Sequence, residues 1–367
     1  MQTHINPSTS VPKGVLLVNL GTPDDPSTSS VRRYLKEFLS DPRVLDIGQV
    51  ARTVLVNAVI APFRSSRSAK SYREIWMKEG SPLFFYSKVL QKELSQTLGA
   101  DWHVELAMRY QNPSIESALQ RMKERGIDHI TVIPLFPHYA SASSGSVQEK
   151  VMSLVSQWQV VPEIFFLKSF HDNPGMIKVF ADHARKHNVA SFDHVLFSFH
   201  GLPVRQLKKA DPCGDWCKAD KVCCETLNSC NKNCYSAQCY DTARLLAAEL
   251  ELDPGNFTVC FQSRLGRDPW VPPYTSEIVK KLALEGKKRV LVFCPAFVAD
   301  CLETLFEVSV EYQEDFKAAG GELMQLVESL NGDPAWVETL SKVIKSRDAL
   351  PEKAFGQAAA LKAALTN

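Results

Sequence analysis

Residues 289–315 read RVLVFCPAFVADCLETLFEVSVEYQED, an apolar run followed by a segment of helical period. The run Arg289–Cys294 is apolar almost throughout, as parallel strands buried on both faces are. After Pro295, apolar residues recur at steps of three and four, which is typical of a helix that packs on a sheet. A buried strand followed directly by such a helix predicts an α/β fold with parallel sheets.

The same alternation of strand and helix patterns recurs along the chain. The other apolar runs are Gly14–Leu20, His103–Met108, His129–Leu135, Glu163–Leu167, His194–Phe199, Phe257–Gln262 and Glu322–Leu326. The segments between the runs read as crossover helices, and a boundary is expected near residues 168–175. We therefore expect two similar doubly wound α/β domains, each with a four-stranded parallel sheet flanked by helices. Their expected bounds are 1–170 and 171–330, with a cysteine-rich insertion at 211–239 and a helical extension at 331–367.

Local signals for helix ends agree with this division. Ser146 followed by Glu149 forms a capping-box pattern, and Pro113-Ser114 precedes another helical segment. Gly126 and Gly286 stand where helices are expected to end.

Composition excludes several classes of function. The chain has 367 residues and a formal net charge of +1, so no global attraction to nucleic acid is expected. The N-terminal residues have no signal-peptide pattern, which favours a cytoplasmic location. The apolar stretch Val54–Phe63 is interrupted by Asn57 and is too short to cross a bilayer, although it can touch a membrane surface.

Ligands in open parallel sheets bind beyond the carboxyl ends of the strands, and two such ends carry reactive side chains. His200 closes the run HVLFSFHGLP, where it is either a structural residue or a base or metal ligand. The second end leads into a helix whose carboxylates, spaced by three and four, share one predicted face: Asp300, Glu303, Glu307, Glu311 and Glu314. This ladder is either a solvated face or a path for a cation.

Two more strand ends have the composition of ligand-binding loops. FQSRLGRDPWVPPYT (261–275) carries Trp270 and Tyr274, which suit a flat apolar ligand or a packed loop between domains. PHYASASSGSVQEK (137–150) opens a helix whose free backbone N–H groups can receive a carboxylate or phosphate. Neither GxGxxG nor GxxxxGK[ST] occurs, so nucleotide binding is not indicated.

Several of these stretches together resemble the ferrochelatases of Gram-negative bacteria. The motifs are LLVNLGTPDDP (16–26), SDPRVLDI (40–47), AMRYQNPSIESAL (107–119), FSFHGLP (197–203), FQSRLGRDPW (261–270) and PAFVADCLETLFE (295–307). The similarity extends from about Gly14 to Asn331. It implies a class II chelatase-like fold that inserts Fe²⁺, as substrate, into protoporphyrin IX in the last step of haem synthesis.

The resemblance also implies roles for particular residues. His200 matches the family's active-site histidine, which we interpret as base and metal contact, and Glu303 and Glu307 match the acidic metal path. Residues that match the family's porphyrin wall or propionate contacts are Arg109, Tyr110, Tyr72, Trp270, Phe297 and Ser144. Arg64 matches a lip that contacts membrane in relatives, so a peripheral membrane contact is expected. Cys301 stands where animal members have a histidine, so a second imidazole is not assumed there.

Seven of the ten cysteines lie between Cys213 and Cys239. In a reducing compartment clustered thiols indicate metal ligation more often than disulfides. The segment resembles a subgroup of ferrochelatases that hold a 2Fe-2S cluster on an internal cysteine-rich segment, although four thiolates suit zinc equally well. The ligands favoured by the pattern are Cys217, Cys224, Cys234 and Cys239, with Cys223, Cys230 and Cys213 as alternates. Cys260, Cys294 and Cys301 are expected to be buried apolar residues.

Other functions stay open from the sequence. An iron–sulfur redox sensor would need the cysteines but not His200 or Glu303. A tetrapyrrole or metal carrier would bind without turnover, and a coproporphyrin or other tetrapyrrole chelatase would differ only in substrate. The sequence does not decide between a monomer and a homodimer.

Overall fold

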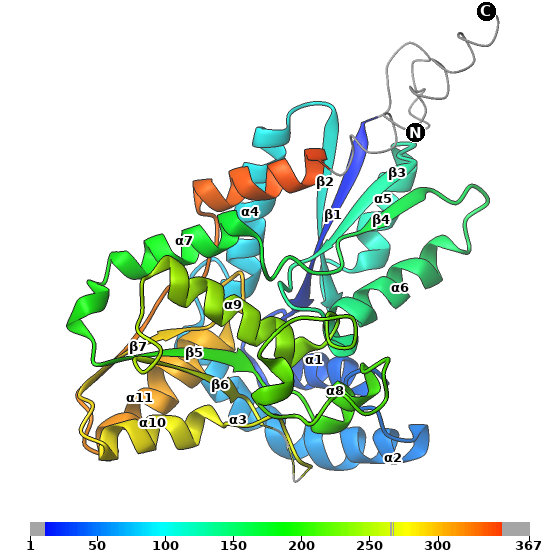
Figure 1. The fold of residues 1–367 in the computed structure, drawn as a ribbon. Helices are drawn as coiled ribbons and strands as arrows, with labels where there is room; N and C mark the ends of the chain where they lie inside the picture. The colour runs from blue at the N-terminus through cyan, green and yellow to red at the C-terminus, as the bar shows by residue number, and fades with distance from the viewer. Residues whose placement is uncertain (1–11, 265, 267, 347–367) are drawn as a thin grey trace, which may run out of the picture.

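The computed structural model describes residues 12–264, 266 and 268–346, and it contains two parallel four-stranded sheets (Figure 1). The first sheet has the order β2-β1-β3-β4 and the second the order β6-β5-β7-β8. The strands are β1 (Lys13–Gly21), β2 (Trp102–Tyr110), β3 (His129–Pro134), β4 (Glu163–Phe166), β5 (His194–His200), β6 (Phe257–Gln262), β7 (Arg289–Phe293) and β8 (Leu323–Leu326). The predicted fold class is confirmed, and the matching strand order makes the two halves alike. The predicted domain bounds stay a prediction.

Helices connect the strands and cover the sheets (Figure 1). The helices are α1 (Thr28–Ser40), α2 (Gln49–Val54), α3 (Ala61–Ile75), α4 (Pro82–Leu98), α5 (Ile115–Glu124), α6 (Ser146–Val155), α7 (Pro174–Arg185), α8 (Val204–Lys209), α9 (Tyr235–Glu249), α10 (Thr275–Leu284) and α11 (Gln313–Ala318). Wider π-helical turns are η1 (Leu55–Ile60), η2 (Ser141–Gly145) and η5 (Glu303–Tyr312), and short 3₁₀ turns are η3 (Val189–Ser191) and η4 (Val222–Cys224). Residues 334–346 are also helical, and the rest of the predicted extension lies outside the described residues.

One buried apolar cluster joins the two halves of the molecule. It contains β1 and β2 residues of the first sheet, Phe197 and Phe293 of the second sheet, and Trp336 of the last helix. Helix α7 contributes Phe180 to the same cluster. Since the core is continuous, the facing strand ends of the two sheets are held at fixed positions relative to each other.

The predictions about helix ends are confirmed at some positions and wrong at another. Ser114 caps α5 and Gly126 and Gly286 follow helix ends with positive φ, as predicted. The capping box at Ser146 is wrong, because Ser146 is the first residue of α6 and its hydroxyl donates to Asp41, 105 residues away. Within the described residues, no helix has the length and apolar character that crossing a membrane requires.

Candidate active site

An open cleft of about 530 Å³ lies between the strand ends of the two halves. Tyr34 and Tyr72 line it from helices α1 and α3, and Phe136 from the loop after β3. The second half contributes residues 296–299 and 301–303, which include Phe297, Cys301 and Glu303. Of the predicted site residues, Tyr72, Phe297 and Glu303 therefore share one cavity that is lined largely by apolar side chains.

His200 is the last residue of β5 and lies against the aromatic wall of this cleft. Its ring centroid is 6.3 Å from that of Trp270 and 6.4 Å from that of Phe297. The Gly201 carbonyl, which can only accept, lies 2.7 Å from Nδ1, so Nδ1 carries the hydrogen and, in the neutral ring, Nε2 carries the lone pair. The imidazole is thus oriented with its basic nitrogen available.

Two neighbours keep His200 in this place. Tyr235, the first residue of α9, donates its hydroxyl to the His200 carbonyl at 2.8 Å. Gly201 makes the turn after β5 feasible, because a Cβ there would lie 2.9 Å from the Gln262 carbonyl oxygen and 3.1 Å from Trp270. The position of His200 therefore depends on a tight turn in which only glycine fits.

The acidic ladder follows η5 rather than an α-helix. Glu303, Glu307 and Glu311 recur at every fourth residue along this wider helix. Glu303 is in the cleft wall, and Glu311 at the other end lies 3.7 Å from Arg67 of α3. Burial and the neighbouring Glu307 carboxylate raise the pKa of Glu311. The ladder thus leads from the cleft toward a partly exposed ion pair.

The prediction that five carboxylates share one helical face is wrong for Asp300. Asp300 is buried ahead of the helix, where it accepts hydrogen bonds from Thr304 at 3.1 Å and from Asn331 at 2.7 Å. These contacts hold the turn that precedes η5. Asp300 is therefore a structural residue under the cleft.

Gln262 links the ladder to the sheet and was missed as a site residue. It is buried at the end of β6, accepts the Ser198 hydroxyl at 2.7 Å, and donates to the Glu303 carbonyl at 3.0 Å and to Glu307 at 3.2 Å. Glu307 also accepts the Ser263 amide at 2.8 Å and the Tyr312 hydroxyl at 2.6 Å. A polar residue that closes an apolar run was the available signal for Gln262.

Cys301 is buried, as predicted, but it also lines the cleft. Burial raises the pKa of its thiol, and the thiol lies within hydrogen-bond reach of the Glu303 carboxylate. Burial and the Glu303 charge likewise raise the pKa of Tyr72. Cys301 and Tyr72 therefore stay protonated at neutral pH, and the Cys301 thiol lies where it can donate to Glu303.

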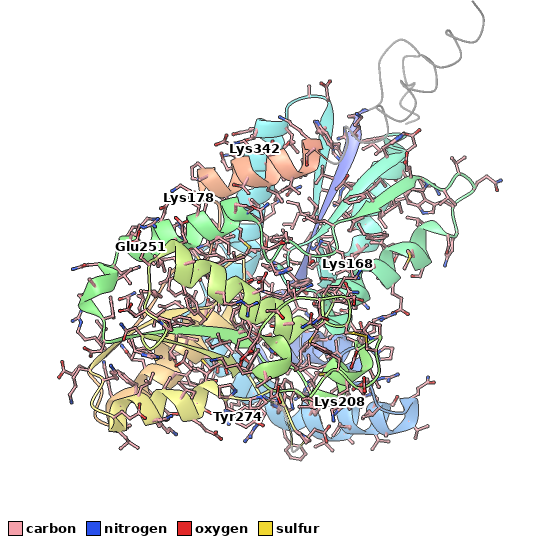
Figure 2. All side chains as sticks on the ribbon, in the orientation of Figure 1. Lys168, Lys178, Lys208, Glu251, Tyr274 and Lys342 are labelled. Carbon is pink, nitrogen blue, oxygen red and sulfur yellow. A yellow bond between two sulfur atoms is a disulfide. The ribbon has the colours of Figure 1, made fainter. Side chains whose placement is uncertain are left out.

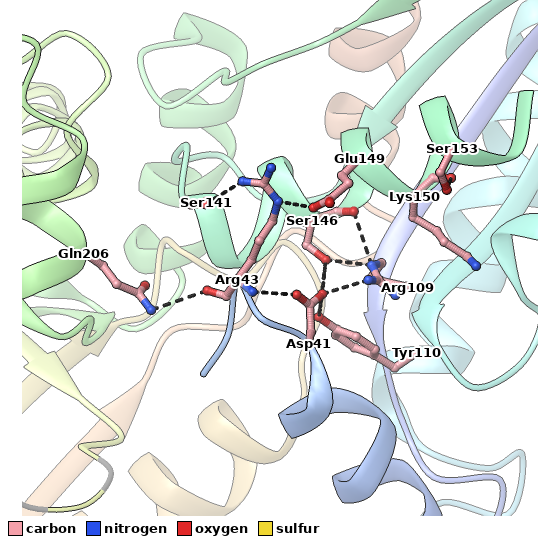
Figure 3. Close-up of polar contacts among 10 residues, drawn as sticks. All are labelled: Asp41, Arg43, Arg109, Tyr110, Ser141, Ser146, Glu149, Lys150, Ser153 and Gln206. Atoms are coloured by element: carbon pink, nitrogen blue, oxygen red, sulfur yellow. Dashed lines mark hydrogen bonds and ion pairs between the residues drawn. The ribbon is translucent and has the colours of Figure 1, made fainter. Parts of the chain in front are cut away.

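Arg109 and Tyr110 belong to a buried network beside the cleft (Figure 3). Asp41 accepts Arg109 at 2.7 Å, the Tyr110 hydroxyl at 2.9 Å and the Ser146 hydroxyl at 2.5 Å. Burial alone would raise the pKa of Asp41, but hydrogen bonds from Ser146, the Arg43 amide and Tyr110 lower it. The predicted propionate contacts Arg109 and Tyr110 are thus engaged by a protein carboxylate that sequence reasoning missed.

The remaining predicted residues lie nearby on different elements. Ser144 is in η2 next to this network, and among the described residues its buried hydroxyl has no hydrogen-bond partner. Arg64 is exposed on α3. It follows exposed apolar side chains on the rod formed by α2, η1 and α3, of which Val50 and Phe63 are each 78% exposed.

Helix α8 follows the His200 turn and connects the two halves. Arg205 and Lys209 each lie 2.7 Å from Asp46 in the loop after α1. Gln206 donates to the Arg43 carbonyl at 3.4 Å (Figure 3). Lys208 of the same helix is labelled in Figure 2 and is exposed. One side of α8 is therefore attached to the first half by ion pairs and a hydrogen bond.

The other side of α8 faces the cysteine-rich segment. Leu207 lines a small pocket of about 220 Å³ with Asp211, Trp216, Cys217, Cys223, Cys230, Asn231 and Cys234. Cys213 and Cys230 form a disulfide, and the other eight cysteines are free. The expectation that clustered thiols here are ligands rather than disulfides is thus wrong for this pair, both of which were alternates.

The remaining thiols of the segment form a row of neighbours. Cys217 and Cys234 are within hydrogen-bond reach, as are Cys234 and Cys224, and the Cys223 and Cys224 sulfurs are 3.8 Å apart. Cys239 is fully buried beside Tyr235. In the part of the chain that the structure describes, no group of three or more His, Cys, Asp or Glu side chains is arranged to hold a metal ion.

Comparison with solved structures defines the class of this fold. SirB from Bacillus subtilis with Fe³⁺ aligns with a TM-score of 0.52 at 14% identity, over 93% of this chain and 98% of that one. The sirohydrochlorin chelatase SirB from B. subtilis subspecies spizizenii, in complex with cobalt, gives a TM-score of 0.51 at 12% identity, over 93% and 97%. The two like halves thus form a two-domain α/β chelatase fold.

Sequence comparison identifies the family. The family model described as Ferrochelatase matches residues 12–348. Ferrochelatases from Coxiella burnetii (strain CbuK_Q154) and Legionella pneumophila (strain Lens) are 43% and 40% identical, over 90% and 91% of this chain and 93% and 99% of theirs. The chain belongs to the ferrochelatase family, whose members are lyases that insert iron into a porphyrin for haem synthesis.

Proposed function

We propose that the chain inserts Fe²⁺ into protoporphyrin IX, with His200 as base and metal contact and Glu303 as its partner. The observation that carries this proposal is the orientation of His200. Its Nδ1–H is held by Gly201 and its ring packs on Phe297, a wall residue of the cleft that also contains Glu303. A basic nitrogen next to the cleft and a carboxylate in its wall are then the reactive groups available to a flat macrocycle.

The reaction requires two pyrrole N–H protons to leave while hydrated Fe²⁺ loses water. Imidazole accepts a proton near neutral pH and is also a ligand for iron, which suits the free Nε2 of His200. The carboxylates of Glu303, Glu307 and Glu311 can pass protons or the incoming cation along η5. The raised pKa of Glu311 supports a role in proton exchange with solvent.

The arginines near the cleft have different roles in this proposal. Because Asp41 already pairs with Arg109, this arginine is assigned to the framework. The exposed Arg64 and the unsatisfied Ser144 hydroxyl are the proposed partners of the porphyrin propionates. Tyr72, Phe297 and Trp270 would contact the ring faces and edges.

An anaerobic assay with Fe²⁺ and either protoporphyrin IX or coproporphyrin III tests the proposal. We expect consumption of protoporphyrin IX to exceed that of coproporphyrin III. His129→Ala is the matched control for a change at His200. His129 is exposed at the first residue of β3, where it pairs with Asp128 and Glu163, so this variant should keep full activity. Preference for coproporphyrin III would show that the chain is a chelatase with a different porphyrin substrate. No turnover with either porphyrin would overturn the proposal.

The same proposal includes a 2Fe-2S cluster on the cysteine-rich segment. Thiolates are the donors that such a cluster needs, and Cys217, Cys234, Cys224 and Cys223 are neighbours in a row that a cluster would have to gather around itself. A bound cluster would supply one-electron redox chemistry next to α8. Cys239 was expected as the fourth ligand, but it is hydrogen-bonded to Tyr235 rather than to another thiol, whereas the Cys223 sulfur is 3.8 Å from that of Cys224, which favours Cys223.

Metal analysis and the visible spectrum of the anaerobic protein test this part. We expect iron and acid-labile sulfide in Cys239→Ser, and their loss in Cys223→Ser. A colourless protein that contains zinc would indicate a tetrahedral zinc site instead. Retention of iron in Cys223→Ser together with its loss in Cys239→Ser would restore the ligand set expected from the sequence.

A peripheral membrane contact through the rod α2–η1–α3 completes the proposal for a chain expected in the cytoplasm. Exposed Val50, Val54, Val59 and Phe63 form an apolar edge. Exposed Arg64 and Lys70 follow on the same rod and can meet anionic headgroups. Sedimentation with phosphatidylglycerol vesicles should fall in Phe63→Ser, with unchanged activity on soluble porphyrin as control.

A further inference from the structure

The two cysteines that are bonded differ in exposure from most of the free ones. Cys213 is exposed and Cys230 is half-buried, whereas Cys224, Cys234 and Cys239 are buried. An accessible sulfur exchanges with small thiols in solution, while a buried one is protected. The Cys213–Cys230 pair is therefore placed where the redox state of the solution can act on it.

Side chains other than the sulfurs hold this pair together. The Asp211 carboxylate accepts the amides of Cys213 at 2.9 Å and Cys217 at 2.8 Å. The Asn228 side chain accepts the Cys230 amide at 2.8 Å, and Asn231 accepts the Asn228 amide at 2.7 Å. Because these turns position both cysteines through their backbones, the two thiols stay near each other when the bond is reduced.

The pair also encloses the other thiols of the segment. The bond joins residues separated by 17 positions, and Cys217, Cys223 and Cys224 lie inside that loop. Cys230 is part of the wall of the pocket that Cys217, Cys223 and Cys234 line. Closing the loop restricts the arrangements available to these thiols.

We propose that Cys213 and Cys230 form a reversible disulfide, distinct from the metal ligands, that tightens the thiol pocket when the surroundings become oxidising. The pair removes two of the seven sulfurs from the ligand set. Cys239 is hydrogen-bonded to Tyr235 rather than to another thiol, so Cys217, Cys223, Cys224 and Cys234 remain, the number of thiolates that a 2Fe-2S cluster needs. Only this count of ligands rests on the proposed cluster; the pair itself does not.

The chemical step is thiol–disulfide exchange with a low-molecular-weight disulfide such as oxidised glutathione. The exposed Cys213 thiolate attacks one glutathione sulfur and releases one glutathione thiolate. The Cys230 thiolate then attacks Cys213 of the mixed disulfide and releases the second. The two protons from the protein thiols end on the two released glutathiones, so one disulfide is reduced as one is formed.

Thiol alkylation of the full chain in glutathione buffers of varied ratio tests the proposal. In oxidised buffer we expect Cys213 and Cys230 to lose alkylation together and to appear as one linked peptide. Cys217 should then alkylate roughly threefold to tenfold more slowly than in reduced buffer, because the closed loop opens less often. In Cys213→Ser, which removes one partner, Cys230 and Cys217 should alkylate at the fast rate in both buffers.

Iron analysis of the same samples separates this proposal from that of the cluster. Linked Cys213 and Cys230 in a protein that takes up no iron would support the pair and refute the cluster. Full alkylation of both cysteines at every ratio would refute the pair. Loss of bound iron in reduced Cys230→Ser, but not in reduced Cys213→Ser, would make Cys230 a ligand and also overturn the proposal.

Discussion

The cleft and the cysteine-rich segment both gather metal-binding side chains, but different parts of the chain hold them in place. In the cleft, His200 and Gln262 end buried strands and Glu303 begins a ten-residue helix. Between Asp211 and Cys234 the regular structure is one 3₁₀ turn, and side chains such as Asn231 supply the hydrogen bonds. The difference indicates that the cleft is rigid before substrate arrives, whereas the segment depends for its order on a few side-chain hydrogen bonds and on the Cys213–Cys230 bond.

The largest expected effect is that of His200→Ala. Removing the proposed base and metal contact should lower kcat by about 10²- to 10⁴-fold. The proposed metal of the cysteine-rich segment should be retained, because His200 is not among the residues of the small pocket. Steady-state kinetics with iron analysis measures both, and a variant that loses its metal along with its activity would show that the two regions are one site.

Asp41→Asn tests the framework of the cleft. The buried carboxylate pairs with Arg109, so the change should lower the free energy of unfolding at pH 7 by about 2 kcal/mol. The folded-state pKa of Asp41 is lowered, so its stabilisation is present above the unfolded-state pKa and is lost as pH falls through the folded-state value. Urea unfolding should show the deficit at pH 7 and a smaller one near pH 3.

A matched change elsewhere separates this network from general loss of an ion pair. Asp182 pairs with Lys178 and Arg185 on the exposed side of α7. Asp182→Asn should change the free energy of unfolding by less than about 0.5 kcal/mol. Equal deficits in both variants would mean that the network in Figure 3 contributes no special stability.

Asp211→Ala tests the weaker order of the segment. Without the carboxylate that accepts the Cys213 and Cys217 amides, the loop should open more often. We expect proteolysis between Cys213 and Cys230 to become several-fold faster under reducing conditions, with the thermal unfolding midpoint unchanged. Equal cleavage rates in the variant and the unchanged protein would mean that the segment is as rigid as the cleft.

The difference between the cleft and the cysteine-rich segment also explains which features could be predicted from the sequence. Strand bounds and fold class followed from the apolar runs, because residues buried on both faces leave a strong local signal. His200 and the ladder were singled out from the sequence because they stand at strand ends. Asp41 and Gln262 were missed, since their roles depend on partners far along the chain, such as Ser146 and Glu307.

Other errors have equally physical causes. Steps of four suit both an α-helix and the wider η5, so the helix type could not be read from the carboxylates. Ser146 matched a capping pattern, but a buried carboxylate competes for its hydroxyl. Among seven cysteines, the pairing of Cys213 with Cys230 depends on turns set by Asp211 and Asn228, which spacing alone does not reveal.

The smallest expected effect comes from the residue that connects the two regions. Tyr235 follows Cys234 directly, and its hydroxyl donates to the His200 carbonyl. Tyr235→Phe leaves that carbonyl without this donor and should raise the activation free energy by about 1 kcal/mol, which is roughly fivefold in kcat, with KM for porphyrin unchanged. Tyr240→Phe, five residues along α9, is the control and should keep kcat. A shift of the pH profile of kcat in Tyr235→Phe would show that Tyr235 positions His200. A change in the free energy of unfolding alone would show that the cleft is independent of the segment.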